Sequence, residues 1–440
     1  MLKLASTRFL RTYLVTLIVL VALTFAANIF MDPFGYYGIV EISGLNNAKA
    51  GMGEHVRLGK AGAIGTIKPR ALVLGNSRAE FGINPEHPGW TAKPVYNLGI
   101  SGANIYEIFR YFQHAHHLQP VDQVLFLLDY NQFNAYWENA PDFSEDRLAI
   151  SFDEIANRHY LYEDFFSTTL SINAVSQSIN TIARSALRKP TTYLKNGQRN
   201  WHNDILFRTV IEKFDSYENL FSIEESGLFA RRSQSKSPPY VESFLNRRTG
   251  LNVFETFRRM VQIAIRDKVD MRFAIGPSHA RYFECHRLMG SWPMWEEWKR
   301  ALVEIIEEEA MIAGVNPFPI WDFSGFNDLT TEPVPSPNTK HIRMRWYFES
   351  SHYTTDLGDL IQDRVFAYKD SARSFPDNFG ALITMKNIDD HLLAIRAQNR
   401  EFRRKFPEVA SALQVMASKY KLSENFAQGV DGRNMTAIWK

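Results

Sequence analysis

The chain alternates between short apolar runs and longer segments in which apolar residues recur every three or four positions. Short runs that are mostly apolar are typical of strands buried on both faces. We predict five such strands, at residues 71–74, 95–98, 124–128, 271–275 and 318–321. The longer spacing predicts helices with one buried face, at residues 104–117, 253–266, 295–313 and 357–368. Because strands and helices alternate, we predict an α/β fold in three layers, with helices on both faces of a parallel sheet and right-handed crossovers.

The longest apolar stretch lies near the N-terminus. Residues 12–31 carry no charged side chain. Three basic residues precede this stretch, Lys3, Arg8 and Arg11. A helix of about 20 residues crosses the roughly 30 Å hydrocarbon core of a bilayer, and basic flanks stay in the cytoplasm. We therefore expect a transmembrane anchor at 12–31, with residues 1–11 cytoplasmic and the remainder outside the cytoplasm. The alternative is a signal peptide cleaved near Ala26 and Ala27.

The remaining chain divides by composition. Residues 32–68 form a Gly-rich lead-in, and residues 69–133 and 247–370 carry the predicted strands. Between these two parts, residues 134–246 are aromatic and biased toward helix. We expect this segment to be a helical insertion that caps the active face. The tail, residues 371–440, is mostly helical and rich in charge. It suits an amphipathic helix packed on the domain, the alternative being a membrane-surface or partner contact.

Charge and metal-ligand content exclude several function classes. The chain has 50 Lys and Arg residues and 48 Asp and Glu residues, which gives a net charge of +2. This charge is too small to indicate binding to nucleic acid. Cys285 is the only cysteine, so the chain has no intramolecular disulfide and no thiol-based metal site. His114, His116 and His117 share one predicted helix but lack a carboxylate at ligand spacing, and we interpret them as surface residues. We expect no metal and no organic cofactor.

Several polar residues lie just after the predicted strands and include groups that a site with a serine nucleophile needs. Parallel sheets bind ligands at the carboxyl ends of their strands. A serine nucleophile needs a general base and a carboxylate that orients the base. Ser77 follows the first strand, and His352 with Glu349 three residues earlier supplies a candidate base and orienter. The backbone N–H groups of Ser77 and Gly102 and the side-chain amide of Asn131 are candidate donors to an oxyanion.

Four further residues have alternative roles. Asp322 and Asp356 are the other candidates for orienting His352, and Asp322 is also a candidate substrate contact. Arg78, next to the predicted nucleophile, suits either an anionic substrate or a structural ion pair. His279 follows the fourth strand and suits either a substrate contact or a structural loop position. Taken alone, Ser77 would be a typical helix N-cap.

The order of these motifs resembles that of the SGNH (GDSL-like) hydrolases. That family has a Ser block after the first strand, a Gly block after the second, an Asn block after the third and a late Asp-x-x-His. Here residues 97–102 (NLGISG) are similar to the Gly block, and residues 124–131 lead to the Asn in a similar way. The chain has Asn76 where the superfamily usually has Asp, and Glu349 in place of the late Asp. The resemblance covers residues 71–368 without the insertion. It implies a flavodoxin-like parallel sheet and an acyl-transfer site.

Within that superfamily, the anchor, the Gly-x-Ser-Arg block and the large insertion resemble the exported proteins of polysaccharide O-acetylation, such as the alginate acetylation proteins. This resemblance implies an O-acyltransferase or esterase, outside the inner (cytoplasmic) membrane, that acts on acyl esters of an exopolysaccharide or cell-envelope glycan. It also implies a membrane-bound O-acyltransferase as acyl donor. One alternative is an inactive SGNH-fold scaffold that binds polysaccharide or assists assembly. The other is a lipid esterase, in which the insertion would line an acyl-chain groove.

Overall fold

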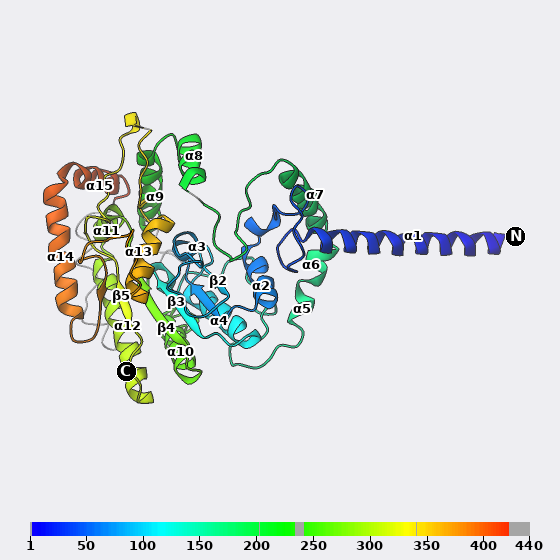
Figure 1. The fold of residues 1–440 in the computed structure, drawn as a ribbon, viewed down its shortest axis with the longest axis horizontal. Coiled ribbons are helices and arrows are strands. Elements are labelled where there is room, and N and C mark those ends of the chain that lie inside the picture. Colours follow the sequence, from blue (N-terminus) through cyan, green and yellow to red (C-terminus); the bar gives the residue numbers. More distant parts are fainter. Residues whose placement is uncertain (1, 202, 234–241, 340, 422–440) are drawn as a thin grey trace. The chain divides into compact units, whose positions relative to one another are not determined.

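The computed structural model describes residues 2–201, 203–233, 242–339 and 341–421 (Figure 1). These residues form two compact units. Unit 1 comprises the described residues within 1–69, 110–120 and 141–200, and unit 2 comprises those within 70–109, 121–140 and 201–440. The segment predicted as an insertion, 134–246, is therefore shared between both units.

A six-stranded sheet forms the centre of unit 2. Its strands are β1 (Ala71–Leu74), β2 (Val95–Asn97), β3 (Gln123–Leu128), β4 (Asp270–Ile275), β5 (Ile320–Asp322) and β6 (Ala381–Leu382). The spatial order is β2-β1-β3-β4-β5-β6, and every neighbouring pair is parallel except β5 with β6. The five predicted strands are confirmed with ends shifted by at most two residues. The sixth was not predicted, because two residues at a sheet edge leave no apolar run.

Helices pack on both faces of this sheet. Successive residues of a strand point to opposite faces. On one face, Ala71 and Val73 share a core cluster with Leu357 and Ile361 of α13 (Thr355–Phe366). On the other face, the Phe273 ring of β4 lies 5.4 Å from the ring of Phe257 in α10 (Val253–Arg266). The mixed α/β class predicted from the sequence is confirmed.

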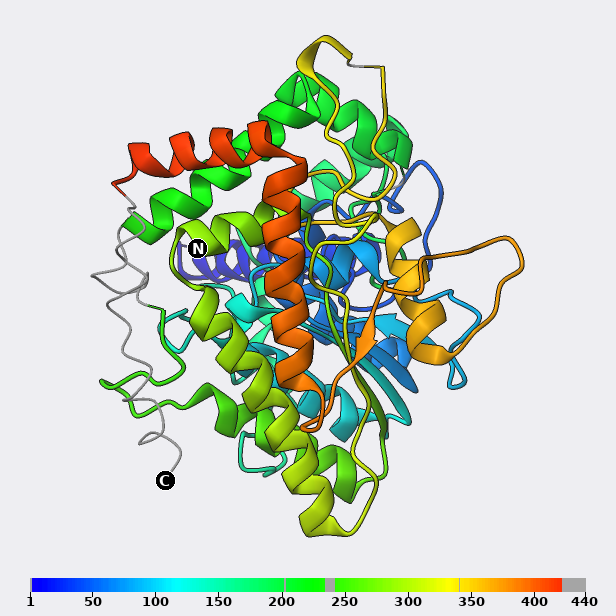
Figure 2. The ribbon, with the colours of Figure 1, turned by 90° about the vertical axis from the view of Figure 1, so that its left-hand side faces the viewer.

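The predicted helices are found with small shifts at their ends. Residues 253–266 are helical as predicted, in α10. The other three predicted helices correspond to α4 (Ile105–Leu118), α12 (Trp292–Ala313) and α13. The further helices of unit 2 are α3 (Ser77–Gly82), α8 (Asn203–Phe214), α9 (Tyr217–Ser233), α11 (Ala280–Leu288), α14 (Ile388–Lys405) and α15 (Pro407–Lys419). Figure 2 shows α14 and α15, in orange and red, crossing the near face. The tail predicted from residue 371 contains β6 followed by these two helices as far as residue 421, and residues 422–440 lie outside the described residues.

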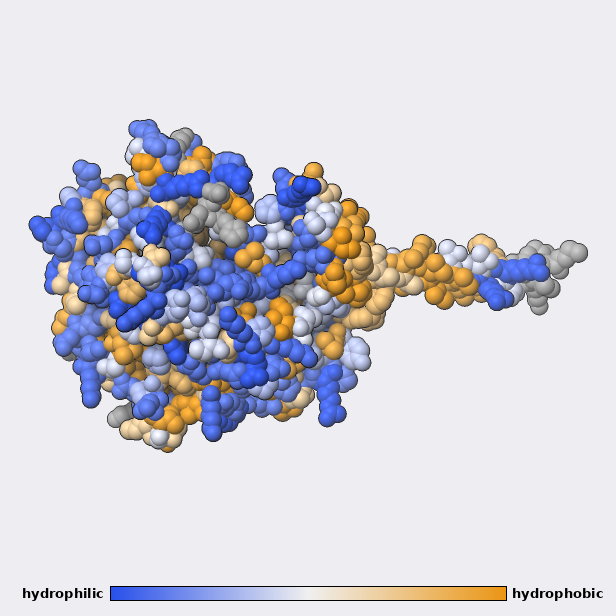
Figure 3. All heavy atoms as spheres, viewed as in Figure 1, coloured by the Kyte–Doolittle hydropathy of each residue, from blue (hydrophilic) through white to orange (hydrophobic). Residues whose placement is uncertain are grey.

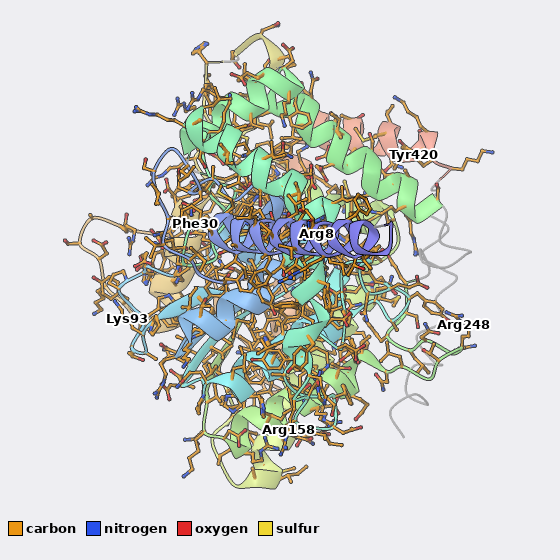
Figure 4. The ribbon with its side chains drawn as sticks, turned by 90° about the vertical axis from the view of Figure 1, so that its right-hand side faces the viewer. Arg8, Phe30, Lys93, Arg158, Arg248 and Tyr420 are labelled. Atoms are coloured by element: carbon orange, nitrogen blue, oxygen red, sulfur yellow. The ribbon has the colours of Figure 1, made fainter. Side chains whose placement is uncertain are left out.

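Unit 1 begins with the helix α1 (Leu2–Met31). Residues 7–31 of this helix are long and apolar enough to cross a membrane, and Figure 4 labels Arg8 and Phe30 upon it. Its other helices are α2 (Val56–Ile67), α5 (Tyr160–Glu163), α6 (Phe165–Thr169) and α7 (Ile172–Ala186). The single apolar span predicted from the sequence is therefore present as one continuous helix.

Candidate active site

The turn after β1 fixes the position of Ser77. Gly75 has φ +146°, and a Cβ at this position would lie 2.7 Å from the Cβ of Ala79 and 2.9 Å from the carbonyl oxygen of Leu127. Only glycine fits there. The side chain of Asn76 then caps α3 by accepting a 3.0 Å hydrogen bond from the backbone N–H of Arg78. Because Asn76 is the cap, Ser77 is not, and its hydroxyl is left to face the cleft.

His352 joins Ser77 to Glu349. Its Nε2 lies 2.6 Å from the Ser77 Oγ, and its Nδ1 forms a hydrogen bond with Glu349 Oε1. The base and the carboxylate lie on one tight turn, flanked by an antiparallel bridge between Tyr347 and Tyr353. Of the three carboxylates considered from the sequence, Glu349 is the one placed to orient the imidazole.

The Glu349 carboxylate is buried and held by several donors. Ser351 donates to it from its backbone N–H (2.7 Å) and from its hydroxyl (2.8 Å). Burial by itself raises the pKa of Glu349, but the charge of His352 and the hydrogen bonds from His352 and Ser351 outweigh it, so the pKa lies below its usual value. The group is therefore ionised at neutral pH and can stabilise a protonated His352.

One cleft of about 200 Å³ brings together five of the predicted site residues, Ser77, Arg78, Gly102, Asn131 and His352. It is lined by Asn76, Ser77, Arg78, Gly102, Asn131, Trp137, Glu224, Leu228, Arg231, Tyr282, Ser350, Ser351 and His352. Gly102 has φ +71° and open space around the position of a Cβ. Asn131 donates one amide hydrogen to the hydroxyl of Tyr282 at 2.7 Å. Since an amide group carries two N–H bonds, Asn131 can direct the second toward an oxyanion.

Arg78 connects several segments around the cleft. Its guanidinium forms a buried ion pair with Asp129 and donates from Nε to the carbonyl oxygen of Ser351 at 2.8 Å. The guanidinium carbon also lies 4.7 Å from the centre of the Tyr282 ring. Of the two roles left open by the sequence, the structure favours the structural ion pair. Arg78 ties the turn after β1 to the end of β3 and to the turn that carries His352.

His279 and Asp322, for which a substrate contact was one of the candidate roles, do not line the cleft. His279 is buried between the rings of Phe221 and Tyr347, at 5.0 and 5.2 Å, and its Nε2 lies 2.7 Å from the carbonyl oxygen of Glu332. Burial lowers the pKa of His279 to about 3. Asp322 pairs instead with the equally buried Lys299, at 2.5 Å. Both side chains are buried and paired within the core, so we interpret them as residues that stabilise the fold.

The interpretation of the three clustered histidines also needs a correction. His114 is buried in unit 1, where its ring nitrogens lie 3.2 Å from the carbonyl oxygen of Ala61 and 2.9 Å from the backbone nitrogen of Ala149. Burial lowers its pKa to about 4. His117 is exposed and His116 half-buried. Among the described residues, no group of three or more His, Cys, Asp or Glu side chains is placed to hold a metal ion.

Residues of α9 complete the cleft and were not predicted. Glu224, Leu228 and Arg231 come from this helix, in the segment that the sequence shows only as helix-biased. The pKa of Glu224 is raised, mainly because the side chain is buried and in second place because the Glu349 carboxylate repels it. No local motif marks these positions, since they reach the site only through the packing of α9. A spacing of three and four residues is the single signal that they share one helix face.

A second, smaller cavity of about 60 Å³ borders the cleft. The two share Asn131, Trp137, Leu228 and Arg231. The second cavity is also lined by His286 and Tyr130, whose side-chain polar atoms have no hydrogen-bond partner within the described part of the chain. Burial, reinforced by Arg78, Arg232 and Arg231, lowers the pKa of His286 to about 3, so its ring is neutral.

Comparison with known proteins adds no family to this picture. No protein-family model matches the chain, and no curated protein matches it.

Proposed function

We propose that the protein is a serine-dependent acyl-transfer enzyme of the SGNH type. The observation that carries the proposal is the linked set Ser77, His352 and Glu349, with 2.6 Å between the Ser77 Oγ and the His352 Nε2. The sheet order 2-1-3-4-5 within unit 2 supports the three-layer, flavodoxin-like arrangement. In that order ligands bind at the point where the order of the strands reverses, between β1 and β3. Ser77 follows β1 and Asn131 follows β3.

The proposed mechanism has two steps. His352 accepts the proton of the Ser77 hydroxyl as Oγ attacks the carbonyl carbon of an acyl ester. Ionised Glu349 stabilises the imidazolium that forms. The oxyanion accepts hydrogen bonds from the N–H groups of Ser77 and Gly102 and from Asn131. As the intermediate collapses, His352 returns the proton to the leaving alcohol, and an acyl-serine remains. In the second step a sugar hydroxyl or water attacks the acyl-serine, again with His352 as base. The ester bond to Ser77 Oγ then breaks, and His352 returns the proton to that oxygen.

The proposed substrate is an acyl ester, in particular an O-acetyl ester, of an exopolysaccharide or cell-envelope glycan. The resemblance of the motifs to the polysaccharide O-acetylation proteins supports this choice, as does the cleft beside Trp137 and Tyr282, which offers aromatic and polar groups together. The apolar helix α1 supports a single-pass anchor in the inner membrane, with the catalytic domain on the extracytoplasmic, periplasmic side. A membrane-bound O-acyltransferase would then supply the acyl group, and we favour transfer to a glycan over hydrolysis.

A covalent probe tests the nucleophile directly. The full-length protein in detergent is incubated with a serine-directed fluorophosphonate, and the mass of the intact protein is measured. We expect one adduct on the wild type, none on Ser77→Ala, and one on the control Ser336→Ala, which changes an exposed serine. A folded wild type that forms no adduct would contradict the proposal and favour an inactive binding or assembly scaffold. An adduct without acetyl transfer to any oligosaccharide would favour an esterase.

A further inference from the structure

Helix α7 in unit 1 has its polar and apolar faces reversed. A helix on a soluble protein turns its apolar face inward. The buried residues of α7 are instead small or polar, namely Ala174, Gln177, Ser178, Thr181 and Ser185. The large apolar residues Ile172, Val175, Ile179 and Ile182 are exposed, Ile172 to 90% and Ile179 to 61%. Their spacing of three, four and three residues places them on one side of the helix.

Hydrogen bonds within unit 1 fix this orientation. Gln177 donates to Glu54 at 3.0 Å, and Ser178 donates to the side chain of Asn28 at 2.7 Å. Thr181 and Ser185 accept from the backbone N–H groups of Ala50 and Ala48, at 3.0 and 2.9 Å. A rotation of α7 that buried its isoleucines would break all four bonds. The apolar face is therefore held outward by the fold.

The neighbouring short helices extend the same surface. Leu161 and Tyr162 of α5 and Phe165 and Phe166 of α6 are exposed as well. Together with the four exposed residues of α7 they form what we call the α5–α7 apolar surface. Figure 3 shows hydrophobic surface gathered where α1 leaves the rest of unit 1. An apolar surface of this extent, continuous over three helices, marks an interaction site.

This surface is continuous with the helix that can cross a membrane. Asn28 of α1 donates to the carbonyl oxygen of Thr169, the last residue of α6, at 2.8 Å. The rings of Phe25 and Phe165 lie 5.6 Å apart. The C-terminal end of helix α1 therefore packs against α6 and α7. The exposed apolar side chains of α1 and the α5–α7 apolar surface form one continuous apolar region. The exposed Arg188 and Lys189 follow α7, as basic residues do at the edge of helices that lie on anionic bilayers.

We propose that the α5–α7 apolar surface inserts into the outer leaflet of the same bilayer that α1 spans, at the boundary between headgroups and acyl chains. Lipid is the favoured occupant because the surface begins where the membrane-crossing helix ends. Unit 1 would then be a membrane-docking platform rather than a simple tether. The proposal rests on the single-pass anchor of the proposed function, but it does not depend on the acyl chemistry.

Depth-dependent fluorescence quenching tests the platform on the full chain. Ile179→Cys, labelled with an environment-sensitive dye, is compared with Val415→Cys, a similarly exposed apolar position of α15 at 56%. The native Cys285 is fully buried and stays unlabelled in the folded protein. In vesicles of mixed neutral and anionic phospholipid, a nitroxide placed near the top of the acyl chains should quench most of the emission at 179 and none at 415.

A third label separates failure of the platform from failure of the anchor. Ile18→Cys lies within α1 and should be quenched by a nitroxide deep in the acyl chains. Quenching at 18 without quenching at 179 would overturn the platform and retain the anchor. Absence of quenching at both would overturn the two together. The emission of the dye at 179 could be blue-shifted and yet not quenched by the lipid nitroxides. That result would overturn lipid as the occupant and indicate a protein partner. Val175→Cys, on the same face, guards against a local effect of one substitution.

Discussion

The Nε2 of His352 lies 2.6 Å from the Oγ of Ser77, although 275 residues separate them in the chain. This contact joins the turn after β1 to a turn that lies beyond β5 in the sequence. Arg78 strengthens the junction by donating to the carbonyl oxygen of Ser351. A nucleophile and a base at hydrogen-bond distance, with a carboxylate behind the base, are the geometric requirement for activating a serine.

The role of Glu349 predicts a large effect of removing its charge. In Glu349→Gln the side chain keeps its shape but no longer stabilises protonated His352, so we expect kcat to fall by on the order of 10³–10⁴-fold. The measurement is hydrolysis of an activated acetyl ester. Asp356→Asn is the matched control, since Asp356 was the other late carboxylate considered as orienter, and it should retain kcat. Loss of activity in both variants to the same extent would contradict the assignment of Glu349.

The Glu349 carboxylate also predicts a pH dependence of folding. Its pKa is lowered in the folded protein from the ordinary 4.5, so the unfolded chain binds the proton more readily. The stabilisation is fully present above that ordinary value and is lost as pH falls through the lowered pKa. Glu349→Gln should therefore lose more stability relative to wild type at neutral pH than at acid pH, as measured by urea unfolding. A difference that stays constant with pH would contradict this.

Asn131 predicts a selective effect on the chemical step. Removing one preorganised oxyanion donor costs about 2.7–4 kcal/mol of transition-state stabilisation, or roughly 10²–10³-fold in kcat. We expect this loss in Asn131→Ala, with little change in KM. Tyr282→Phe removes the hydroxyl that accepts from Asn131 but leaves the amide in place, and it should lose far less activity. An equal loss in both variants would show that Asn131 acts through its hydrogen bond with Tyr282 and not as an oxyanion donor.

The Arg78–Asp129 pair predicts a strong and non-additive effect on stability. Either Arg78→Ala or Asp129→Ala leaves one buried charge without its partner, which costs about 3–5 kcal/mol of unfolding free energy. The double variant should lose less than the sum of the two, because neither charge remains. Arg70→Ala, which removes an exposed partner of Asp122, is the control and should change little. Simple additivity in the double variant would contradict direct coupling.

His286 predicts a second contribution to folding stability that is lost in acid. The folded pKa of about 3 lies below the ordinary 6.5, so stability from neutral His286 is present above 6.5 and falls as pH decreases toward 3. His286→Phe removes this proton uptake together with ring nitrogens that cost about 1–3 kcal/mol when buried without partners. The variant should equal or exceed wild-type stability at neutral pH, and its advantage should grow in acid.

His279→Phe is the matched comparison for His286. That substitution breaks the contact with the Glu332 carbonyl oxygen and the hydrogen bond from the Arg281 backbone N–H. It should therefore destabilise the protein at neutral pH by about 1–3 kcal/mol. If His286→Phe proved as destabilising as His279→Phe, the polar atoms of His286 would be satisfied in a way that the described contacts do not show.

Local patterns in the sequence were sufficient for the sheet and for part of the site. Unbroken apolar runs mark β1 and β3 because both faces of these strands are buried. Ser77, Gly102 and Asn131 were predicted because each lies just beyond a strand, and all carboxyl ends of parallel strands share one edge. The edge strand β6 was missed because its two residues form no pattern.

Long-range packing decided what the sequence left open. Glu349 and Asp322 were both credible partners of His352 until the structure showed Asp322 paired with Lys299. His279 occupies the expected end of β4, but Phe221 from α9 covers its ring. The reversed faces of α7 were equally invisible, because the composition of the helix does not reveal which side the bonds from Asn28 and Glu54 hold inward.

Glu349 and His352 lie on the same short turn, so the proposed base and the carboxylate that orients it form one local unit of the chain. Its two side chains are hydrogen-bonded to one another within four residues, so their mutual placement depends on the conformation of this turn. The fold has to align this turn with the β1 turn and with the candidate oxyanion donors Gly102 and Asn131. Arg78, in the β1 turn, links the first two by donating to the carbonyl oxygen of Ser351. Under the proposed mechanism, a change of carboxylate at position 349 has to be accommodated within this turn, because the same turn carries the base that the carboxylate orients.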